Sequence, residues 1–362
     1  MSKNKMIVIK VGTKVIASPD KTLDRALLKG LVGQISDMLD KGLKAIIVTS
    51  GAIGAGMGLL NLKRRPVKLE ELQATASIGQ SHLMHLYSGY FKERGYLAGQ
   101  ILLTQEDFND RARYLNIKRT IATLLSHNAV PIINENDTVS TEEIKCGDND
   151  RLSSLVSDLC CADMLILLSD VDGLLDEKGD VVNFVDDINS KVTKLARQSK
   201  CELGTGGMAS KLESIRRVTA SGIECVIANG KTKNIIADVI DGKIVGTRFK
   251  SFGTKLLAKK RWIAFSSRPM GTVYVDSGAR EALSSKNRSL LASGIVAVDG
   301  HFVSGDVVRI SDKSFGEFAR GITNYSSPEL LRIKGLKTAQ IKSVMGHKSR
   351  DEVVHKDELV IL

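Results

Sequence analysis

The sequence lacks the features that mark several classes of protein. It contains no uncharged apolar stretch of the roughly 18 residues that a membrane-spanning helix needs, and the apolar run at residues 6–9 is too short for the core of a signal peptide. None of its 5 cysteines forms a Cys-x-x-Cys pair, so neither a disulfide framework nor a zinc site is indicated. With 43% apolar residues the chain can bury a core, and we expect a soluble cytoplasmic protein without a membrane partner.

Aromatic residues are scarce as well, at 4% of the chain, which leaves few side chains on which nucleic-acid bases could stack. The net charge of +11 would by itself suggest nucleic-acid binding. However, residues 229–270 alone carry +8, residues 271–362 carry +2, and the residues before them carry only +1. The excess charge therefore belongs to one connecting segment, which is more typical of a solvated face, and we expect no nucleic-acid partner.

Short apolar runs alternate with helical patterns from residue 5 to about residue 230. The runs have the composition of buried strands, and they lie at residues 6–10, 45–48, 100–103, 129–133, 164–168 and 225–228. Leucines and isoleucines at helical spacing predict a helix between the first two runs, which Thr22 can cap and Gly42 ends. Further helices are predicted at about residues 70–91, 114–127, 150–161 and up to residue 221. Fully apolar strands that alternate with helices indicate an α/β fold with a parallel sheet covered on both faces.

The pattern changes after residue 270. Short alternating runs appear at residues 271–275, 294–298 and 305–310, separated by Gly and Asp, and they predict a small, mostly β domain. We therefore predict an α/β catalytic domain in residues 1–255, a basic linker in residues 256–270 and the small β domain in residues 271–362.

We expect the binding and catalytic residues in the loops at the carboxyl ends of the predicted strands, because ligands of open α/β sheets bind there. Lys10 ends the first strand beside Gly12, an arrangement that suits a phosphate, although a solvated lysine would give the same pattern. Residues 49–56 (TSGAIGAG) either offer backbone N–H groups to an anion or form a tight packing turn. Residues 204–211 (GTGGMASK) place Lys211 behind a glycine-rich turn, which fits nucleotide phosphates better than a dinucleotide.

Two tetrads of acids and amides lie within 17 residues of each other, NEND at residues 134–137 and GDND at residues 147–150. Helix capping explains one of them, since Asp and Asn are good capping residues. Two together indicate a site for an ammonium group or a metal-bound phosphate. Phosphoryl transfer requires mainly positioning and positive charge, and two lysines, glycine-rich loops and carboxylates supply these without a covalent nucleophile.

These motifs as a set resemble the amino acid kinase family. They are KVGT at residues 10–13, VTSGAI at 48–53, PIINEND at 131–137, KCGDND at 145–150 and GTGGMASK at 204–211. Within the family, the two tetrads together resemble the members that phosphorylate glutamate. The resemblance covers essentially the whole chain and continues into a C-terminal segment similar to a PUA domain. It implies an α/β/α sandwich with a mostly parallel central sheet, followed by a small, mostly β PUA-like domain.

The resemblance implies that the chain transfers the γ-phosphoryl group of ATP to the γ-carboxylate of L-glutamate, the first step of proline biosynthesis. It also implies Mg²⁺, feedback inhibition by proline and a homo-oligomer of two or four subunits. Because an acyl phosphate is labile, glutamyl phosphate reductase is an expected partner. We expect the basic segment at residues 229–270 to attract ATP through its field. The sequence leaves open an enzyme of this fold that acts on another small acid or a nucleoside monophosphate, and an RNA-binding protein.

The resemblance assigns roles to the residues that match the family's motifs. Lys10 and Lys211 would stabilise charge on the transferred phosphoryl group, and Asp150 would orient both lysines. The residues implied in glutamate binding are Ser50, Gly51, Asn134, Asp137, Asp148 and Asn149. Those implied in ATP binding are Lys10, Gly12, Thr13, Ser169, Asp170, Thr205, Gly206, Gly207, Met208 and Lys211. No residue is predicted to bind a metal directly. The chain departs from the family at Ser169, where Thr is frequent, and at Leu175, where Tyr is frequent.

Overall fold

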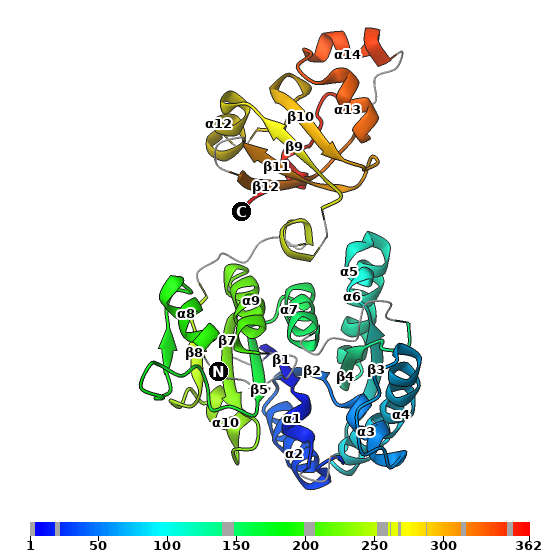
Figure 1. Cartoon of the computed structure of the whole chain (residues 1–362), viewed down its shortest axis with the longest axis vertical. Coiled ribbons are helices and arrows are strands. Elements are labelled where there is room, and N and C mark those ends of the chain that lie inside the picture. Colours follow the sequence, from blue (N-terminus) through cyan, green and yellow to red (C-terminus); the bar gives the residue numbers. More distant parts are fainter. Residues whose placement is uncertain are drawn as a thin grey trace. The chain divides into compact units, whose positions relative to one another are not determined.

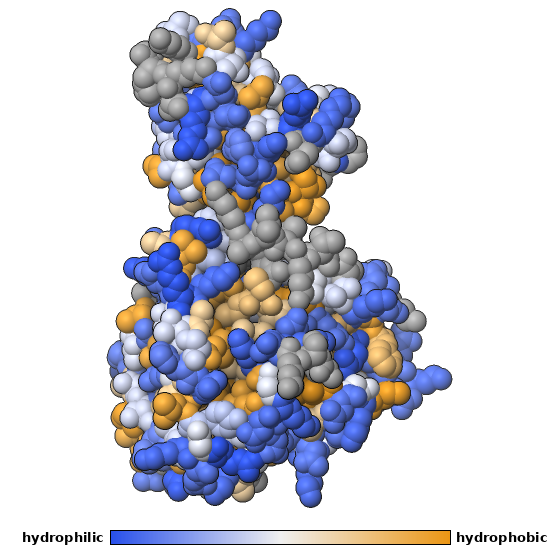
Figure 2. Space-filling model, turned by 180° about the vertical axis from the view of Figure 1, so that it is seen from behind, coloured by the Kyte–Doolittle hydropathy of each residue, from blue (hydrophilic) through white to orange (hydrophobic). Residues whose placement is uncertain are grey.

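The computed structural model describes residues 4–18, 22–139, 148–198, 207–251, 260, 262–266, 269–286, 288–312, 316–345 and 350–362. The chain divides into two compact units, Met1–Lys255 and Leu256–Leu362, and each has its own sheet and apolar core (Figure 1). Within the described residues, no helix is both long and apolar enough to cross a membrane. Hydrophilic residues cover most of the face drawn in Figure 2, interrupted by small apolar patches.

An eight-stranded sheet forms the centre of the first unit. Its strands are β1 (Met6–Val11), β2 (Lys44–Thr49), β3 (Leu97–Leu103), β4 (Ala129–Glu135), β5 (Met164–Ser169), β6 (Phe184–Val185), β7 (Glu224–Asn229) and β8 (Thr247–Phe249). They lie in the order β3-β4-β2-β1-β5-β7-β8-β6, and every neighbouring pair is parallel except β7 and β8. The predicted mostly parallel sheet is confirmed. The short strands β6 and β8 at one edge were not predicted.

Helices cover both faces of this sheet (Figure 1). They are α1 (Thr13–Ile16), α2 (Arg25–Asp40), α3 (Ala52–Leu59), α4 (Leu69–Glu93), α5 (Glu106–Asn109), α6 (Arg111–Ser126), α7 (Asp148–Cys160), α8 (Ser190–Gln198), α9 (Met208–Ala220) and α10 (Ile235–Ile240). Ile7, Ile9 and Val11 of β1 share one core cluster with residues of α2, α4 and α10. Helices α6, α7 and α9 contact the strands from the other side. Because successive side chains of a strand point to opposite faces, Lys10 points toward α7 and α9.

The first long helix begins two residues later than predicted. The side chain of Asp24 caps α2 by accepting the backbone N–H of Leu27 at 2.9 Å, and the helix starts at Arg25. Thr22 instead closes a turn with Ser18, and their hydroxyl oxygens lie 2.9 Å apart. The prediction that Thr22 caps the helix is therefore wrong. A capping side chain accepts an N–H two or three positions into the helix, and Asp24 has that spacing.

The second unit contains a five-stranded sheet in the order β10-β9-β11-β12-β13. Its strands are β9 (Gly271–Val275), β10 (Ile295–Gly300), β11 (Val307–Asp312), β12 (Gly316–Ile322) and β13 (Leu359–Ile361), and its longer helices are α12 (Ser277–Lys286), α13 (Ser327–Ile333) and α14 (Thr338–Met345). The small β domain is confirmed, but its helices were not predicted. One of them did carry a signal, because Ser326 and Glu329 form a capping box at the start of α13.

Candidate active site

Two buried lysines meet on one buried carboxylate at the carboxyl ends of the central strands. The Lys10 Nζ atom lies 2.6 Å from Oδ1 of Asp150, and the Lys211 Nζ atom lies 3.2 Å from Oδ2 of the same carboxylate. Asp150 is fully buried, and the lysines are 6% and 7% exposed. The three residues come from β1, α7 and α9, which lie far apart in the sequence. The structure therefore brings together the three residues for which the resemblance implies a catalytic role.

The local sequence explains why these side chains converge. Lys10 alternates with Ile9 and Val11, so it points to the face of the sheet that α7 and α9 cover. Asp150 lies in the first turn of α7. Lys211 lies one turn inside α9, which begins after Gly207, a residue in extended conformation with no side chain to cap the helix. Free N–H groups at a helix start favour an anion, and a lysine one turn later adds a full charge to that end.

The charges of the two lysines keep Asp150 ionised. Burial alone would raise the pKa of the Asp150 carboxyl, but the charges and hydrogen bonds of Lys10 and Lys211 outweigh burial and hold the pKa below its ordinary value. The carboxylate is thus a fixed negative charge that orients two ammonium groups. The pair of lysines and the single carboxylate carry a net charge of about +1 at neutral pH, which suits a site for a phosphoryl group.

A second group of side chains, beside the first, consists of amides and one hydroxyl. The Asn149 Nδ2 atom donates to Oγ of Ser50 at 2.9 Å and to Oδ1 of Asn134 at 3.1 Å. The Asn134 Nδ2 atom in turn donates to Oε1 of Gln80 on α4 at 2.8 Å. Three residues predicted to bind the substrate therefore lie in direct contact. Sequence reasoning missed Gln80, because nothing distinguishes it from other polar residues on its helix.

Glycines allow the backbone to approach closely at the turn after β2. Gly51 has a φ of +99°, and a Cβ atom there would lie 2.8 Å from the Cδ1 atom of Ile16. Gly56 and Gly79 bring α3 and α4 together, since a Cβ on Gly79 would lie 1.8 Å from the backbone oxygen of Ala52. The glycines at residues 51 and 56 therefore support the prediction of a tight packing turn at residues 49–56. Ser50 at its start contacts Asn149, and Gly56 at its end is a packing contact.

Four of the residues predicted to bind ATP, Gly12, Thr13, Ser169 and Asp170, lie at the ends of the neighbouring strands β1 and β5. The Gly12 backbone N–H donates to the Leu168 carbonyl at 3.1 Å, and the Ser169 hydroxyl donates to Oδ1 of Asp170 at 3.3 Å. Lys14 in α1 lies 3.3 Å from Oδ2 of Asp170. Burial raises the pKa of Asp170, but its own backbone N–H and Lys14 outweigh this and lower it. Lys14 is a further basic residue at this edge that the sequence analysis did not single out.

The structure describes some of the remaining predicted site residues only in part, and others not at all. Thr205 and Gly206 lie outside the described residues, as does the side chain of Asp148. Asp137 lies in a turn two residues after β4, Thr13 begins α1, and Met208 begins α9 and is buried. Among the described residues, no three His, Cys, Asp or Glu side chains gather in the manner of a metal site.

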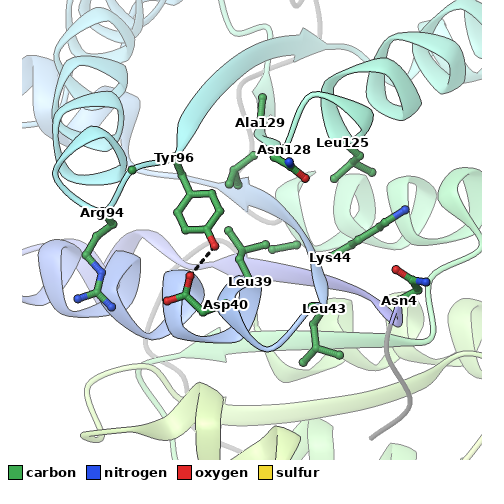
Figure 3. A pocket seen from close by; sticks show the side chains of 14 residues that line it. Asn4, Leu39, Asp40, Leu43, Lys44, Arg94, Tyr96, Leu125, Asn128 and Ala129 are labelled. Carbon is green, nitrogen blue, oxygen red and sulfur yellow. Dashed lines mark hydrogen bonds between the residues drawn. The ribbon is translucent and has the colours of Figure 1, made fainter.

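A separate pocket of about 650 Å³ lies at the opposite, amino ends of the strands (Figure 3). Lys44 at the start of β2 and Ala129 at the start of β4 line it, together with Arg94 and Tyr96. The Tyr96 hydroxyl donates to Oδ1 of Asp40 at 2.6 Å across this pocket. None of the predicted site residues lines it, so the pocket is distinct from the candidate active site.

Comparisons with known proteins agree with this geometry. Residues 5–229 match the model of the amino acid kinase family, and residues 271–345 match that of the PUA domain. A protein named glutamate 5-kinase from Caldanaerobacter subterraneus subsp. tengcongensis is 44% identical over 98% of this chain and 97% of its own length. Another of that name, from Moorella thermoacetica, is 42% identical over 100% of this chain and 97% of its own length.

A solved structure, carbamate kinase from Giardia lamblia bound to AMP-PNP, aligns with 70% of this chain and 100% of its own, at 18% sequence identity and a TM-score of 0.48. The matches of the curated relatives extend over both units of the chain and therefore include the second sheet as well as the first. The family model spans the strands and helices that hold Lys10, Asp150 and Lys211. The chain belongs to the amino acid kinase family, to its glutamate 5-kinase branch, and carries a PUA domain behind the kinase domain.

Proposed function

We propose that this protein transfers the γ-phosphoryl group of ATP to the γ-carboxylate of L-glutamate and releases L-glutamyl 5-phosphate and ADP. The observation that carries the proposal is the convergence of Lys10 and Lys211 on the buried carboxylate of Asp150. Full-length relatives named glutamate 5-kinase support the choice of substrate. We further propose the domain boundaries predicted above, with the kinase domain in residues 1–255, the linker in 256–270 and the PUA domain in 271–362.

The chemistry needs little from the protein beyond position and charge. An oxygen of the glutamate γ-carboxylate attacks the γ-phosphorus, the bond to the bridging oxygen breaks, and ADP leaves with the electron pair. A carboxylate is already deprotonated at neutral pH, so the step requires no general base. Lys10 and Lys211 would face the negative charge that spreads over the phosphoryl oxygens, and preorganised charge of this kind usually makes the largest contribution to the rate. Asp150 would hold both ammonium groups in place.

The two ligands would occupy adjoining halves of the site. The Asn149, Ser50 and Asn134 cluster would bind glutamate, with Gly51, Asp148 and Asp137 around it, and Asp137 would pair with the α-ammonium group. Gly12, Thr13, Ser169 and Asp170, and residues 205–208, would bind ATP. Mg²⁺ would be held mainly by the ATP phosphates and would neutralise part of their charge. The proposed reaction requires no protein residue as a direct ligand of the metal.

The resemblance of the motifs and the lability of an acyl phosphate motivate the further parts of the proposal. We infer a homo-oligomer, feedback inhibition by proline, and a partnership with a reductase that consumes the labile acyl phosphate. The use of ATP supports a cytoplasmic location. We expect no sequence-dependent RNA binding by the PUA domain at physiological salt, and titration of labelled RNA checks this.

Trapping with hydroxylamine tests the proposed function directly, because acyl phosphates react with it to give hydroxamates, which form coloured complexes with iron(III). We expect signal with glutamate and ATP, and little with aspartate or acetylglutamate. Lys10→Met should lose about 100-fold or more of the turnover, since removal of one stabilising charge or donor in a transition state typically costs that much. Signal with another acid instead of glutamate would favour a different acceptor, and an unaffected Lys10→Met variant would refute the mechanism.

A further inference from the structure

Gln80 lies behind the proposed glutamate site, on helix α4, where no role has been assigned to it. The residue is 9% exposed, and its Oε1 atom accepts the Nδ2–H of Asn134 at 2.8 Å. The preceding residue, Gly79, allows this contact. The backbone of α4 lies so close to the first turn of α3 that a Cβ on Gly79 would lie 1.8 Å from the backbone oxygen of Ala52. A helix at this distance places Gln80 within reach of the strand ends.

The contacts of Asn134 fix which way its amide points. A side-chain amide offers an acceptor on its oxygen and donors on its nitrogen, and a backbone N–H can only donate, so the contact with Glu135 identifies the oxygen of Asn134. The Asn134 Nδ2 atom donates to Gln80, and the Asn134 Oδ1 atom accepts the backbone N–H of Glu135 at 2.9 Å and the Nδ2–H of Asn149 at 3.1 Å. Gln80 and the Glu135 backbone thus act together to hold the oxygen of Asn134 toward Asn149.

The orientation of Asn134 determines in turn which atom of the Asn149 amide remains available to a ligand. The nitrogen of Asn149 donates to Asn134 and to Ser50, which leaves its Oδ1 atom as an acceptor. This oxygen is buried and has no hydrogen-bond partner within the part of the chain that the structure describes. A buried acceptor without a partner costs free energy until a donor reaches it. An ammonium group carries a positive charge and only donors, so it complements the partial negative charge and the acceptor character of this oxygen.

We propose that Gln80 is a positioning residue that sets the polarity of the amino-acid site, so that Asn149 presents an oxygen to the ammonium group of the substrate. The inference rests on the proposed function and names the group of the substrate that is recognised. Without the acceptor on Gln80, the nitrogen of Asn134 loses its buried partner, and only the Glu135 backbone still orients the amide. If Asn134 turned over, Asn149 would turn over too and point N–H groups at the ammonium group.

Three variants test the role of Gln80. Gln80→Met keeps the length of the side chain but removes the amide oxygen, and it should raise the KM for glutamate about tenfold or more, with the KM for ATP within about twofold. Gln80→Glu keeps an oxygen in the same place and should restore most of the affinity. Thr75→Val, a buried change on the same helix, removes only a bond to the carbonyl of Glu71 and should leave both KM values unchanged.

A double-mutant cycle separates positioning from a general loss of structure. In an Asn134→Ala background, Gln80→Met should raise the KM for glutamate by less than about twofold, because its effect passes through Asn134. An unchanged KM in the single Gln80→Met variant, or fully additive effects in the cycle, would overturn the proposal. If Gln80→Met does not fold, Gln80→Asn withdraws the oxygen by one methylene and serves in its place. A wild-type protein that is inactive with glutamate would instead refute the proposed function itself.

Discussion

Replacement of Asp150 by asparagine tests the charge arrangement most directly, because it leaves two buried ammonium groups without their shared carboxylate. The two contacts measure 2.6 and 3.2 Å, and the lysine side chains are 8% and 9% exposed, so water screens them poorly. At an effective dielectric constant of about 20, each contact corresponds to about 5–6 kcal/mol of gross attraction. Desolvation opposes most of this, and removal of one partner from a buried ion pair typically costs about 3–5 kcal/mol net.

We expect the lower end of that range, about 3 kcal/mol, because the asparagine oxygen still accepts a hydrogen bond. For a domain of this size, the loss should lower the Tm by about 6–12 °C in scanning calorimetry. Turnover should fall about 100-fold, because two ammonium groups that repel each other no longer stay in position. Asp24→Asn is the matched control, since asparagine caps a helix as well as aspartate does and the Tm should hardly change.

The pH dependence of the Tm supplies a second readout of the same variant. The folded-state pKa of Asp150 is lowered, so its stabilising contribution is complete above the unfolded-state pKa of about 3.9 and is lost as the pH falls through the folded-state value. The difference in Tm between wild type and Asp150→Asn should therefore be constant above about pH 5 and shrink in stronger acid. Equal Tm and equal turnover at pH 7 would refute the view that Asp150 holds the two lysines.

Three further substitutions follow from the packing and contacts of the site. Lys211→Met should lower kcat about 100-fold in an assay of ADP release, with little change in the binding of glutamate measured by calorimetry. Ser50→Ala removes an acceptor from Asn149 and should raise the KM for glutamate about tenfold while kcat changes little. Gly79→Ala should cost about 3 kcal/mol of folding free energy in urea titrations, because the new methyl group overlaps a backbone oxygen. Gly89→Ala on the same helix meets nothing within 4 Å and should instead stabilise by up to about 1 kcal/mol.

The periodicity of apolar residues was sufficient to predict the central strands, because those strands are buried on both faces and read as continuous apolar runs. The edge strands β6 and β8 contain two and three residues, too few for a pattern to be seen. The helices of the second unit were missed for a related reason. α12 (SGAREALSSK) has one buried residue, Leu283, so its sequence shows hardly any apolar face.

Candidate site residues could be predicted from the sequence where they lie in a short recognisable motif. They could not be predicted where they contact a residue of a distant helix or strand. Lys10 ends a predicted strand and Lys211 follows a glycine-rich turn, and each feature is visible in one short stretch of sequence. Gln80 contacts Asn134, 54 positions away in the sequence, and Lys14 contacts Asp170, which follows a different strand far along the chain. No short stretch of sequence contains both partners, so neither contact could be predicted from a motif. The packing of α3 on α4 is similar. Only the fold shows that Gly79 faces a backbone oxygen and not a ligand.

Helix α7 contributes one residue to the proposed glutamate site and one to the cluster of Lys10, Lys211 and Asp150. Asn149 and Asp150 are consecutive, and consecutive residues of an α-helix point about 100° apart. One therefore faces Ser50 in the amide cluster, while the other reaches Lys10 and Lys211. A rotation or shift of this helix would move the acceptor carboxylate and the stabilising charges together. Since a misplacement of about 1 Å can cost 100-fold in rate, we expect a substitution that loosens the packing of α7 against β1 and α9 to lower turnover without touching a ligand.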